Sequence, residues 1–304
     1  MSRDRIAVLY LTAFFAPLLM ICAGAAPAAG QAVQRADGVV RNPPNRSLLP
    51  FSSYYFCTAT RPGEHHHMDM NVASGTTDRC GPTYTYAEGP RGPRHWEGVC
   101  QTGHMQTPID ISSPKKVSLK LLPQLLFSYQ PAELDIVNDC NNYQIKLRFP
   151  PNHWLKVSRK PYRLSEVRFR EPGETAVNGK RPPMALELVH LSPEANFLIV
   201  EVPVVVGKEN PTIKKLWEHI PLPGREFKIA DIKINVTDLI PADHGFYRFP
   251  GSLTVPICNE PVQWYLMKNP IEMSKAQIDQ YRKYYHDTAR PLQAVNNRPL
   301  VESQ

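Results

Sequence analysis

Short segments of alternating apolar residues, bounded by proline, glycine or asparagine, constrain the fold of this chain more than any other feature. Such segments fit strands, because successive side chains of a strand point to opposite faces. The 31 prolines and 16 glycines are spread along the 304 residues, which favours many turns. The predicted strands are 133–138, 143–149, 153–158, 165–170, 184–191, 196–207, 225–234 and 258–267. Helical spacing occurs over 210–220 and 274–287, so the sequence predicts a mainly β protein with few short helices.

Residues 1–26 have the features of a secretory signal peptide. Arg3 and Arg5 precede an apolar stretch, 6–22, and small residues follow where a peptidase could cut. The stretch is short for a membrane span, although an uncleaved anchor is the alternative. No second long apolar segment follows. We therefore expect a secreted mature chain without a transmembrane span.

The remainder of the chain divides by composition. Residues 27–82 are rich in Pro, Gly, Ser and Thr and lack periodic apolar positions, so we expect a loosely ordered extension. Residues 83–304 are expected to form one domain. In the extension, the run "EHHHMDM" contains His65 and His67, which could bind a transition metal weakly. An exposed polar stretch is the more common interpretation of such a run.

The cysteines are interpreted as disulfide partners, because the predicted signal implies an oxidising compartment. Cys22 lies in the signal, and the others are Cys57, Cys80, Cys100, Cys140 and Cys258. This odd number leaves one cysteine unpaired or paired between chains, and counting does not settle the pairing. The sequons at Asn45 and Asn235 predict N-glycosylation if the chain follows a eukaryotic secretory route.

The net charge of +7 includes small basic clusters at "SPKKVSLK" and "VSRKPYR". Such a charge could favour an acidic protein or a polyanion as partner, whereas a solvated basic surface is the simpler interpretation. No nucleic-acid-binding motif accompanies these clusters, so no nucleic-acid partner is predicted.

Charged residues interrupt the apolar pattern in two successive predicted strands. Arg168 and Arg170 share one strand face, while Val167 and Phe169 share the other. Glu187 stands at an inward position of the next strand. Buried charges are costly unless they are paired, so these three residues mark a site that needs an explanation.

Four sequence blocks resemble those of α-carbonic anhydrases, in the same order. They are "HWEGVCQTGHMQTPIDI" (95–111), "NGKRPPMALELVH" (178–190), "YRFPGSLTVPICNEPVQW" (247–264) and "RPLQAVNNRPL" (290–300). The resemblance spans about residues 84–302 and implies a single domain around a central, mostly antiparallel ten-stranded sheet. It also implies a conical cavity with zinc at its floor. Active members hold the zinc by three neutral histidines and lower the pKa of its bound water to about 7.

The three positions that match the zinc ligands carry other residues. Arg168 and Arg170 match the His-x-His pair, and Glu187 matches the third histidine. Between His153 and His190 there is no histidine, so no shift of the alignment restores the ligands. A guanidinium offers no lone pair to a metal. The chain is therefore identified as a carbonic anhydrase-related member for which we predict no zinc, no other cofactor and no CO2 hydration.

We hypothesise that the three charges replace the metal structurally. Glu187 would reach between Arg168 and Arg170 as an Arg–Glu–Arg group. Its surplus positive charge could hold a small anion in the cavity. The alternative is that the charges satisfy only one another or water.

Other positions are assigned through the same resemblance. Thr254 matches the threonine that orients the zinc-bound hydroxide, and Glu174 matches the carboxylate that accepts its proton. Thr175 stands where a further histidine of the active site usually lies. The positions that match the cavity wall are Asn141, Val189, Leu253, Val255 and Trp264.

The resemblance also predicts a Cys100–Cys258 disulfide, as in extracellular members. Cys57 with Cys80 is then a plausible second bridge that leaves Cys140 unpaired, although Cys140 could pair with either of them.

We therefore expect a secreted carbonic anhydrase-related protein that is catalytically inactive and acts as a binding or structural module. A small anion, a protein or a polyanion would be its partner. One alternative is an active carbonic anhydrase or esterase with an altered metal centre. Another is a storage or matrix protein.

Overall fold

The computed structural model describes residues 80–304, all of which belong to one compact unit, Thr58–Gln304. The predicted signal peptide and nearly all of the predicted extension lie outside the described residues. So do Asn45, Cys57 and the histidine run that contains His65 and His67. The predicted boundary between residues 82 and 83 stays a prediction.

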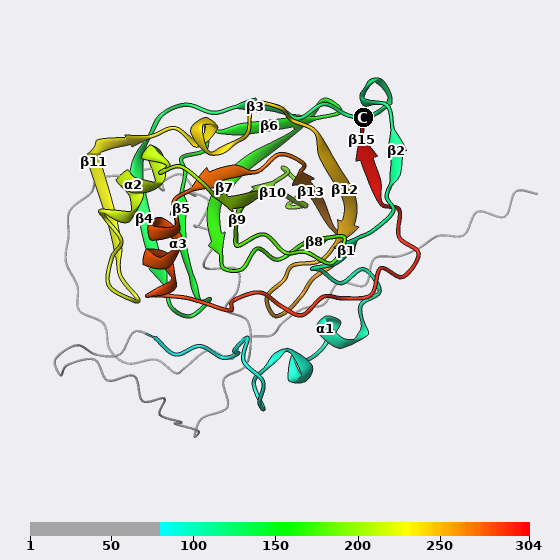
Figure 1. Ribbon diagram of the computed structural model, residues 1–304, viewed down its shortest axis with the longest axis horizontal. Coiled ribbons are helices and arrows are strands. Elements are labelled where there is room, and N and C mark those ends of the chain that lie inside the picture. The colour runs from blue at the N-terminus through cyan, green and yellow to red at the C-terminus, as the bar shows by residue number, and fades with distance from the viewer. Residues whose placement is uncertain (1–79) are drawn as a thin grey trace, which may run out of the picture. The chain divides into compact units, whose positions relative to one another are not determined.

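A sheet of thirteen strands organises the described residues (Figure 1). Its main path has the order β11-β4-β5-β7-β9-β10-β13-β12-β15-β2. These strands are β2 (Lys115–Val117), β4 (Ala132–Asp139), β5 (Gln144–Arg148), β7 (Lys160–Arg170), β9 (Met184–Leu191), β10 (Phe197–Val206), β11 (Glu226–Ile234), β12 (Phe246–Gly251), β13 (Val262–Met267) and β15 (Val301–Ser303). Neighbours are antiparallel except in the pairs β10–β13 and β15–β2. The expectation of a central, mostly antiparallel sheet is confirmed; its main path has the ten strands expected, and three further strands extend it.

Shorter elements complete the fold. Three strands join the sheet beside its main path, namely β3 (Leu126–Ser128), β6 (Trp154–Val157) and β14 (Ile271–Met273), and β1 (Asp110–Ile111) pairs with β8 (Ala176–Val177). The α-helices are α1 (Val99–Thr102), α2 (Pro211–Trp217) and α3 (Lys275–Arg282), and the 3-10 helices are η2 (Pro93–His95), η3 (Leu119–Leu121) and η4 (Val236–Leu239). No helix within residues 80–304 is long and apolar enough to cross a membrane.

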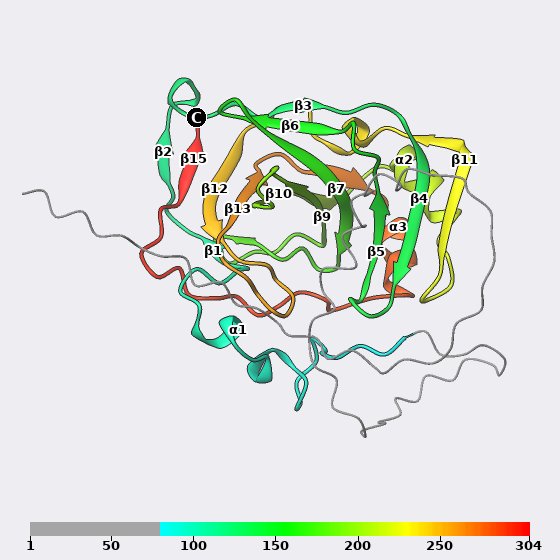
Figure 2. The same cartoon turned by 180° about the vertical axis from the view of Figure 1, so that it is seen from behind.

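Local sequence explains where the two longer helices begin. The Asn210 side chain accepts hydrogen bonds from two amides of the first turn of α2, and Pro211 occupies its first position. Ser274 and Gln277 form a reciprocal capping box at the start of α3. Both helices therefore fall within the predicted ranges. Figures 1 and 2 show them together near the β4–β5 side of the sheet.

The main apolar core lies between the sheet and these two helices. Phe169 of β7 is fully buried, its ring 4.8 Å from that of Trp217 in α2. The Tyr281 hydroxyl of α3 donates to the Phe169 carbonyl at 2.7 Å. Burying one such side chain contributes about 2 kcal/mol, so this face of β7 is firmly oriented. Because side chains alternate along the strand, Arg168 and Arg170 face the opposite side of the sheet.

Candidate functional site

Arg170 is the centre of a completely buried charged group. It is the last residue of β7, and its Nε lies 3.6 Å from Glu187 Oε2 and 4.0 Å from Glu174 Oε2. Its Nη1 donates to the Tyr86 hydroxyl at 3.2 Å. Within residues 80–304, Arg170 Nε and Nη2 and both carboxylate oxygens of Glu187 have no hydrogen-bond partner. The group is therefore held by charge more than by hydrogen bonds.

Glu174 is a buried carboxyl group with a strongly shifted pKa. Burial raises the pKa of Glu174 well above its ordinary value, and the neighbouring charge of Glu187 raises it further. The side chain of Thr254 acts in the other direction and lowers the pKa of Glu174. The neutral form of Glu174 is favoured beside the buried Arg170–Glu187 ion pair.

Arg168 does not join this group, so the predicted Arg–Glu–Arg arrangement is wrong. Arg168 and Glu187 are opposite each other in the β7–β9 register, but the Arg168 guanidinium pairs with Glu166. Glu166 lies two residues earlier on the same strand face, within reach of the Arg168 side chain. Lys146 of β5 lies 3.6 Å from Glu166 and 2.8 Å from Asp139. The two cations of this second network are balanced by two carboxylates.

Charge pairing also sets the protonation of Glu166. Burial alone would raise the pKa of Glu166, but the charges of Arg168 and Lys146 outweigh burial and lower it. Glu166 is therefore ionised at neutral pH.

Glu201 of β10 is a further buried carboxyl group on this side of the sheet. It lies opposite Glu187 in the β9–β10 register. The Thr175 amide donates to one of its oxygens at 3.1 Å and the Thr175 hydroxyl to the other. Burial raises the pKa of Glu201 to about 7, against the lowering by the Thr175 hydroxyl. Thr175, predicted at a former histidine position, thus holds a titratable carboxyl group in place.

An aromatic cluster covers the Arg170 group. Tyr84, Tyr86, Trp96 and Tyr143 contact one another edge to face, with ring centroids 5.3 to 5.9 Å apart. The same cluster includes Val255, one of the predicted wall residues. Burial raises the pKa of Tyr86 to about 12, so the hydroxyl that contacts Arg170 stays protonated. We call residues 80–100, which carry three of the four rings, the cover segment.

A disulfide fixes the cover segment at each end. Cys100 pairs with Cys258, as predicted. Cys80 pairs with Cys140, so the preferred Cys57–Cys80 pairing is wrong and the alternative in which Cys140 takes part is confirmed. The Asn141 side chain, next to this bridge, accepts from the Gly81 amide at 2.8 Å, which brings the cover segment to the β4–β5 turn.

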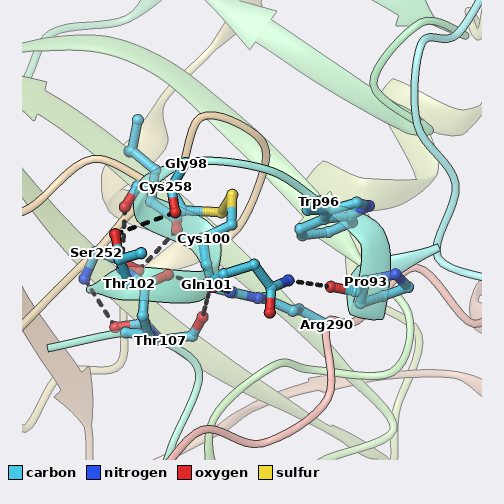
Figure 3. The surroundings of a disulfide bond; sticks show 12 residues. Pro93, Trp96, Gly98, Cys100, Gln101, Thr102, Thr107, Ser252, Cys258 and Arg290 are labelled. Atoms are coloured by element: carbon cyan, nitrogen blue, oxygen red, sulfur yellow. Dashed lines mark hydrogen bonds between the residues drawn. A yellow bond between two sulfur atoms is a disulfide. The ribbon is translucent and has the colours of Figure 1, made fainter. Parts of the chain in front are cut away.

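Arg290 anchors the second end of the cover segment (Figure 3). Its Nη2 donates to the Cys100 carbonyl at 2.8 Å, and its Nη1 donates to the Thr107 carbonyl at 3.0 Å. The guanidinium carbon lies 5.5 Å from the centre of the Trp96 ring. Burial lowers the pKa of Arg290 to about 10, so it remains a cation at neutral pH. One side chain therefore joins the disulfide, the Trp96 ring and the core.

The predicted wall residues occupy two kinds of environment. Val189, Leu253, Val255 and Trp264 are buried, and Trp264 Nε1 donates to the Ser252 carbonyl at 2.9 Å. Asn141 is apart from them in an exposed turn. The sequon residue Asn235 is half-buried at the start of η4, and its glycosylation stays a prediction.

Comparison with known proteins decides the family. The model of the eukaryotic-type carbonic anhydrase matches residues 91–304. The chain belongs to the carbonic anhydrase family. It is 34% identical to a carbonic anhydrase of Nostoc sp. over 71% of this chain and 84% of that protein. It is also 27% identical to dioscorin DB3S of Dioscorea polystachya, over 71% of this chain and 85% of that protein.

Solved structures of the family agree with the fold. A hyperthermostable carbonic anhydrase from an active hydrothermal vent chimney aligns with a TM-score of 0.67 and 34% identity. The alignment covers 73% of this chain and 100% of that one. The fold expected from the resemblance is therefore shown by both sequence and structure.

The residues that the sequence resemblance assigns to the zinc position do not fit zinc. Arg168 and Arg170 are permanent cations without a lone pair, and Glu187 is already engaged by Arg170. Within residues 80–304, no group of three or more His, Cys, Asp and Glu residues is arranged to hold a metal ion.

Sequence reasoning missed several partners of the arginines. Glu166 could have been found, because the period of two places it on the face of Arg168 and Arg170. Lys146, Tyr86 and Glu201 come from other elements, and no local pattern in the sequence connects them to this group.

Proposed function

We propose that this chain is a secreted carbonic anhydrase-fold protein that binds no zinc, does not hydrate CO2 and acts as a binding module. The observation that carries the proposal is the buried Arg170–Glu187 ion pair at two of the family's zinc-ligand positions. CO2 hydration in this family depends on a zinc-bound hydroxide held by neutral imidazoles. A guanidinium at that place repels a divalent cation and supplies no ligand.

The cover segment supports the same proposal. Tyr86 contacts Arg170 directly, and Trp96 and Tyr84 pack beside it. A small substrate would have to displace these rings to reach the former reaction centre. The two disulfides at the ends of the segment oppose such a displacement.

The disulfides also support a secretory location, because such bonds persist in oxidising compartments. A small anion at the site has less support than the sequence suggested. Glu166 offsets the charge of Arg168, and Glu187 offsets that of Arg170. We therefore place the binding role on the surface of the molecule.

Zinc content and CO2 hydration test the proposal on untagged chain purified from a secretory host. We expect a zinc content near zero per chain and hydration at the uncatalysed rate. The matched control is the triple variant Arg168→His, Arg170→His, Glu187→His, which restores the three imidazoles. If the control gains zinc and the natural chain holds none, the three substitutions account for the loss. Zinc near one per chain in the natural protein, with catalysed hydration, would refute the proposal.

A second candidate is CO2 hydration or ester hydrolysis at an altered centre. The relatives named carbonic anhydrases favour it, as does the effect of Thr254 on the pKa of Glu174. Catalysed hydration that persists in a chelator and falls in Thr254→Val would support this candidate. Activity that is unchanged in Thr254→Val would assign it to a contaminating enzyme.

A further inference from the structure

The two basic clusters of the sequence lead into one surface groove. The first, 113–120, continues toward β3, and the second, 157–163, begins at the end of β6. β3 pairs with β6, with Leu126 opposite Lys156. The groove has a volume of about 450 Å³ and is lined by Pro123, Gln124, Leu126, Lys156, Ser158, Arg159 and Pro161. We call it the β3–β6 groove.

The groove contains two cations, Lys156 and Arg159, and the sequence segments that flank it carry no acidic residue. Residues 112–132 and 150–165 contain no aspartate or glutamate. Lys156 and Arg159 are exposed, and neither forms an ion pair with any residue of the described part of the chain. By contrast, the exposed Lys228 and Lys233 both lie near Glu133. The β3–β6 groove is therefore a basic site open to an acidic partner.

The turn that presents Arg159 has an unusual backbone. Ser158 and Arg159 have φ values of 49° and 67°, in the left-handed region that favours glycine or asparagine. This tight turn joins β6 to β7 and is anchored by the β6–β7 pairing from Trp154 to Val157. Arg159 is consequently held on a rigid hairpin rather than on a loose loop.

The groove also has an apolar side. Leu126 is 55% exposed, although it is a large aliphatic residue, and Pro123 and Pro161 line the groove with it. A second groove of about 480 Å³ lies along β3 and includes Leu126, Phe127, Ile240 and Pro241. Leu126 is thus shared by the two grooves. A partner here would need apolar side chains as well as negative charge.

We propose that the β3–β6 groove binds an extended acidic peptide segment of a partner protein. Its carboxylates would pair with Lys156 and Arg159, and an apolar side chain would cover Leu126. A sulfated polysaccharide offers the charge but no side chain for the apolar side. The groove is separate from the Arg170 group, so this inference holds whether or not the chain hydrates CO2.

Fluorescence anisotropy of a short labelled peptide that alternates glutamate and leucine tests the assignment on the full mature chain. We expect saturable binding that weakens as salt is raised. The double variant Lys156→Glu, Arg159→Glu should weaken binding by about tenfold or more. The control Lys215→Glu, Lys283→Glu makes the same charge change at two exposed lysines outside the groove and should bind as the natural chain does. Equal loss in both double variants, or no binding by the natural chain, would overturn the proposal.

Leu126→Ser separates a peptide from a polysaccharide. Leu126 is largely exposed, so its replacement should not disturb folding. Binding of the glutamate–leucine peptide should fall severalfold in Leu126→Ser. If instead heparin binds more tightly than the peptide and Leu126→Ser binds both as before, the groove recognises charge alone and the peptide assignment is wrong.

Discussion

At the residue scale, the buried centre of this fold is polar and contains an arginine–glutamate ion pair. Arg170 and Glu187 form a buried ion pair at positions that the sequence resemblance assigns to two histidines, and Glu174 lies beside them. The free-energy cost of removing two charges from water is offset by their mutual attraction only while both partners are present. The pair is therefore sensitive to the loss of either member, and more tolerant of the loss of both.

Replacement of Arg170 alone should be strongly destabilising. In Arg170→Met, Glu187 remains buried without its cation, and we expect a loss of about 3 to 5 kcal/mol in the free energy of unfolding. The double variant Arg170→Met, Glu187→Leu should recover much of this loss. Urea denaturation measures both. The control Arg94→Met removes an exposed arginine near Glu88 and should cost at most about 1 kcal/mol. A loss in Arg170→Met no larger than in this control would contradict a structural role for the pair.

Glu201 should make stability depend on pH. Its pKa is about 7 in the folded protein, above the ordinary 4.5, so its protonated form is favoured by folding. This contribution is fully present below pH 4.5 and is lost as pH rises through 7, by about 3 kcal/mol in total. In Glu201→Gln, the free energy of unfolding should fall less between pH 5 and pH 8 than in the natural chain. Urea denaturation of both proteins at several pH values measures their free energies of unfolding. Identical pH profiles for the two proteins would refute the role of Glu201.

At the element scale, β7 and the cover segment define the site. β7 places Phe169 in the apolar core, and its alternate residues Arg168 and Arg170 face the other side. The cover segment then closes over Arg170 through Tyr86. Because the cover segment removes Arg170 from water, the charge of Arg170 has to be paired inside the protein, as it is with Glu187.

The disulfides of the cover segment can be tested directly. Peptide mapping without reductant should recover Cys80 linked to Cys140 and Cys100 linked to Cys258. Cys80→Ser with Cys140→Ser opens a loop that spans 60 positions, which the chain-entropy model values at about 4 kcal/mol. Urea denaturation of this variant measures the loss. Recovery of all four cysteines as free thiols would contradict both bridges.

The elements were more predictable than the contacts between them. Each predicted strand is present within a few residues, because alternation along a strand is a local property. The partner of Arg168 was predicted wrongly, since register alone does not show that Glu166 lies nearer than Glu187. The pairing of Cys140 depends on how residues far apart in the chain meet, and the cysteine count carries no such information.

At the scale of the whole molecule, the buried centre and the exposed surface have separate charge balances. Arg168 and Arg170 are each paired with a buried carboxylate, so neither adds an unpaired positive charge to the centre. Much of the net charge of +7 must therefore lie elsewhere, and Lys156 and Arg159 are part of it. An electrostatic partner would meet this protein at its surface.

The spans of the two disulfides overlap along the chain, from Cys80 to Cys140 and from Cys100 to Cys258. A single peptide-bond cut anywhere between Cys80 and Cys258 consequently leaves both fragments covalently attached. A protease that nicks the cover segment would release neither piece, and the nicked molecule would separate only after reduction. Residues 259–304, which include β13, α3 and β15, lie beyond this protected interval and are retained by packing and hydrogen bonds alone. Within residues 80–304, a single cut that releases a separate fragment must therefore fall after Cys258.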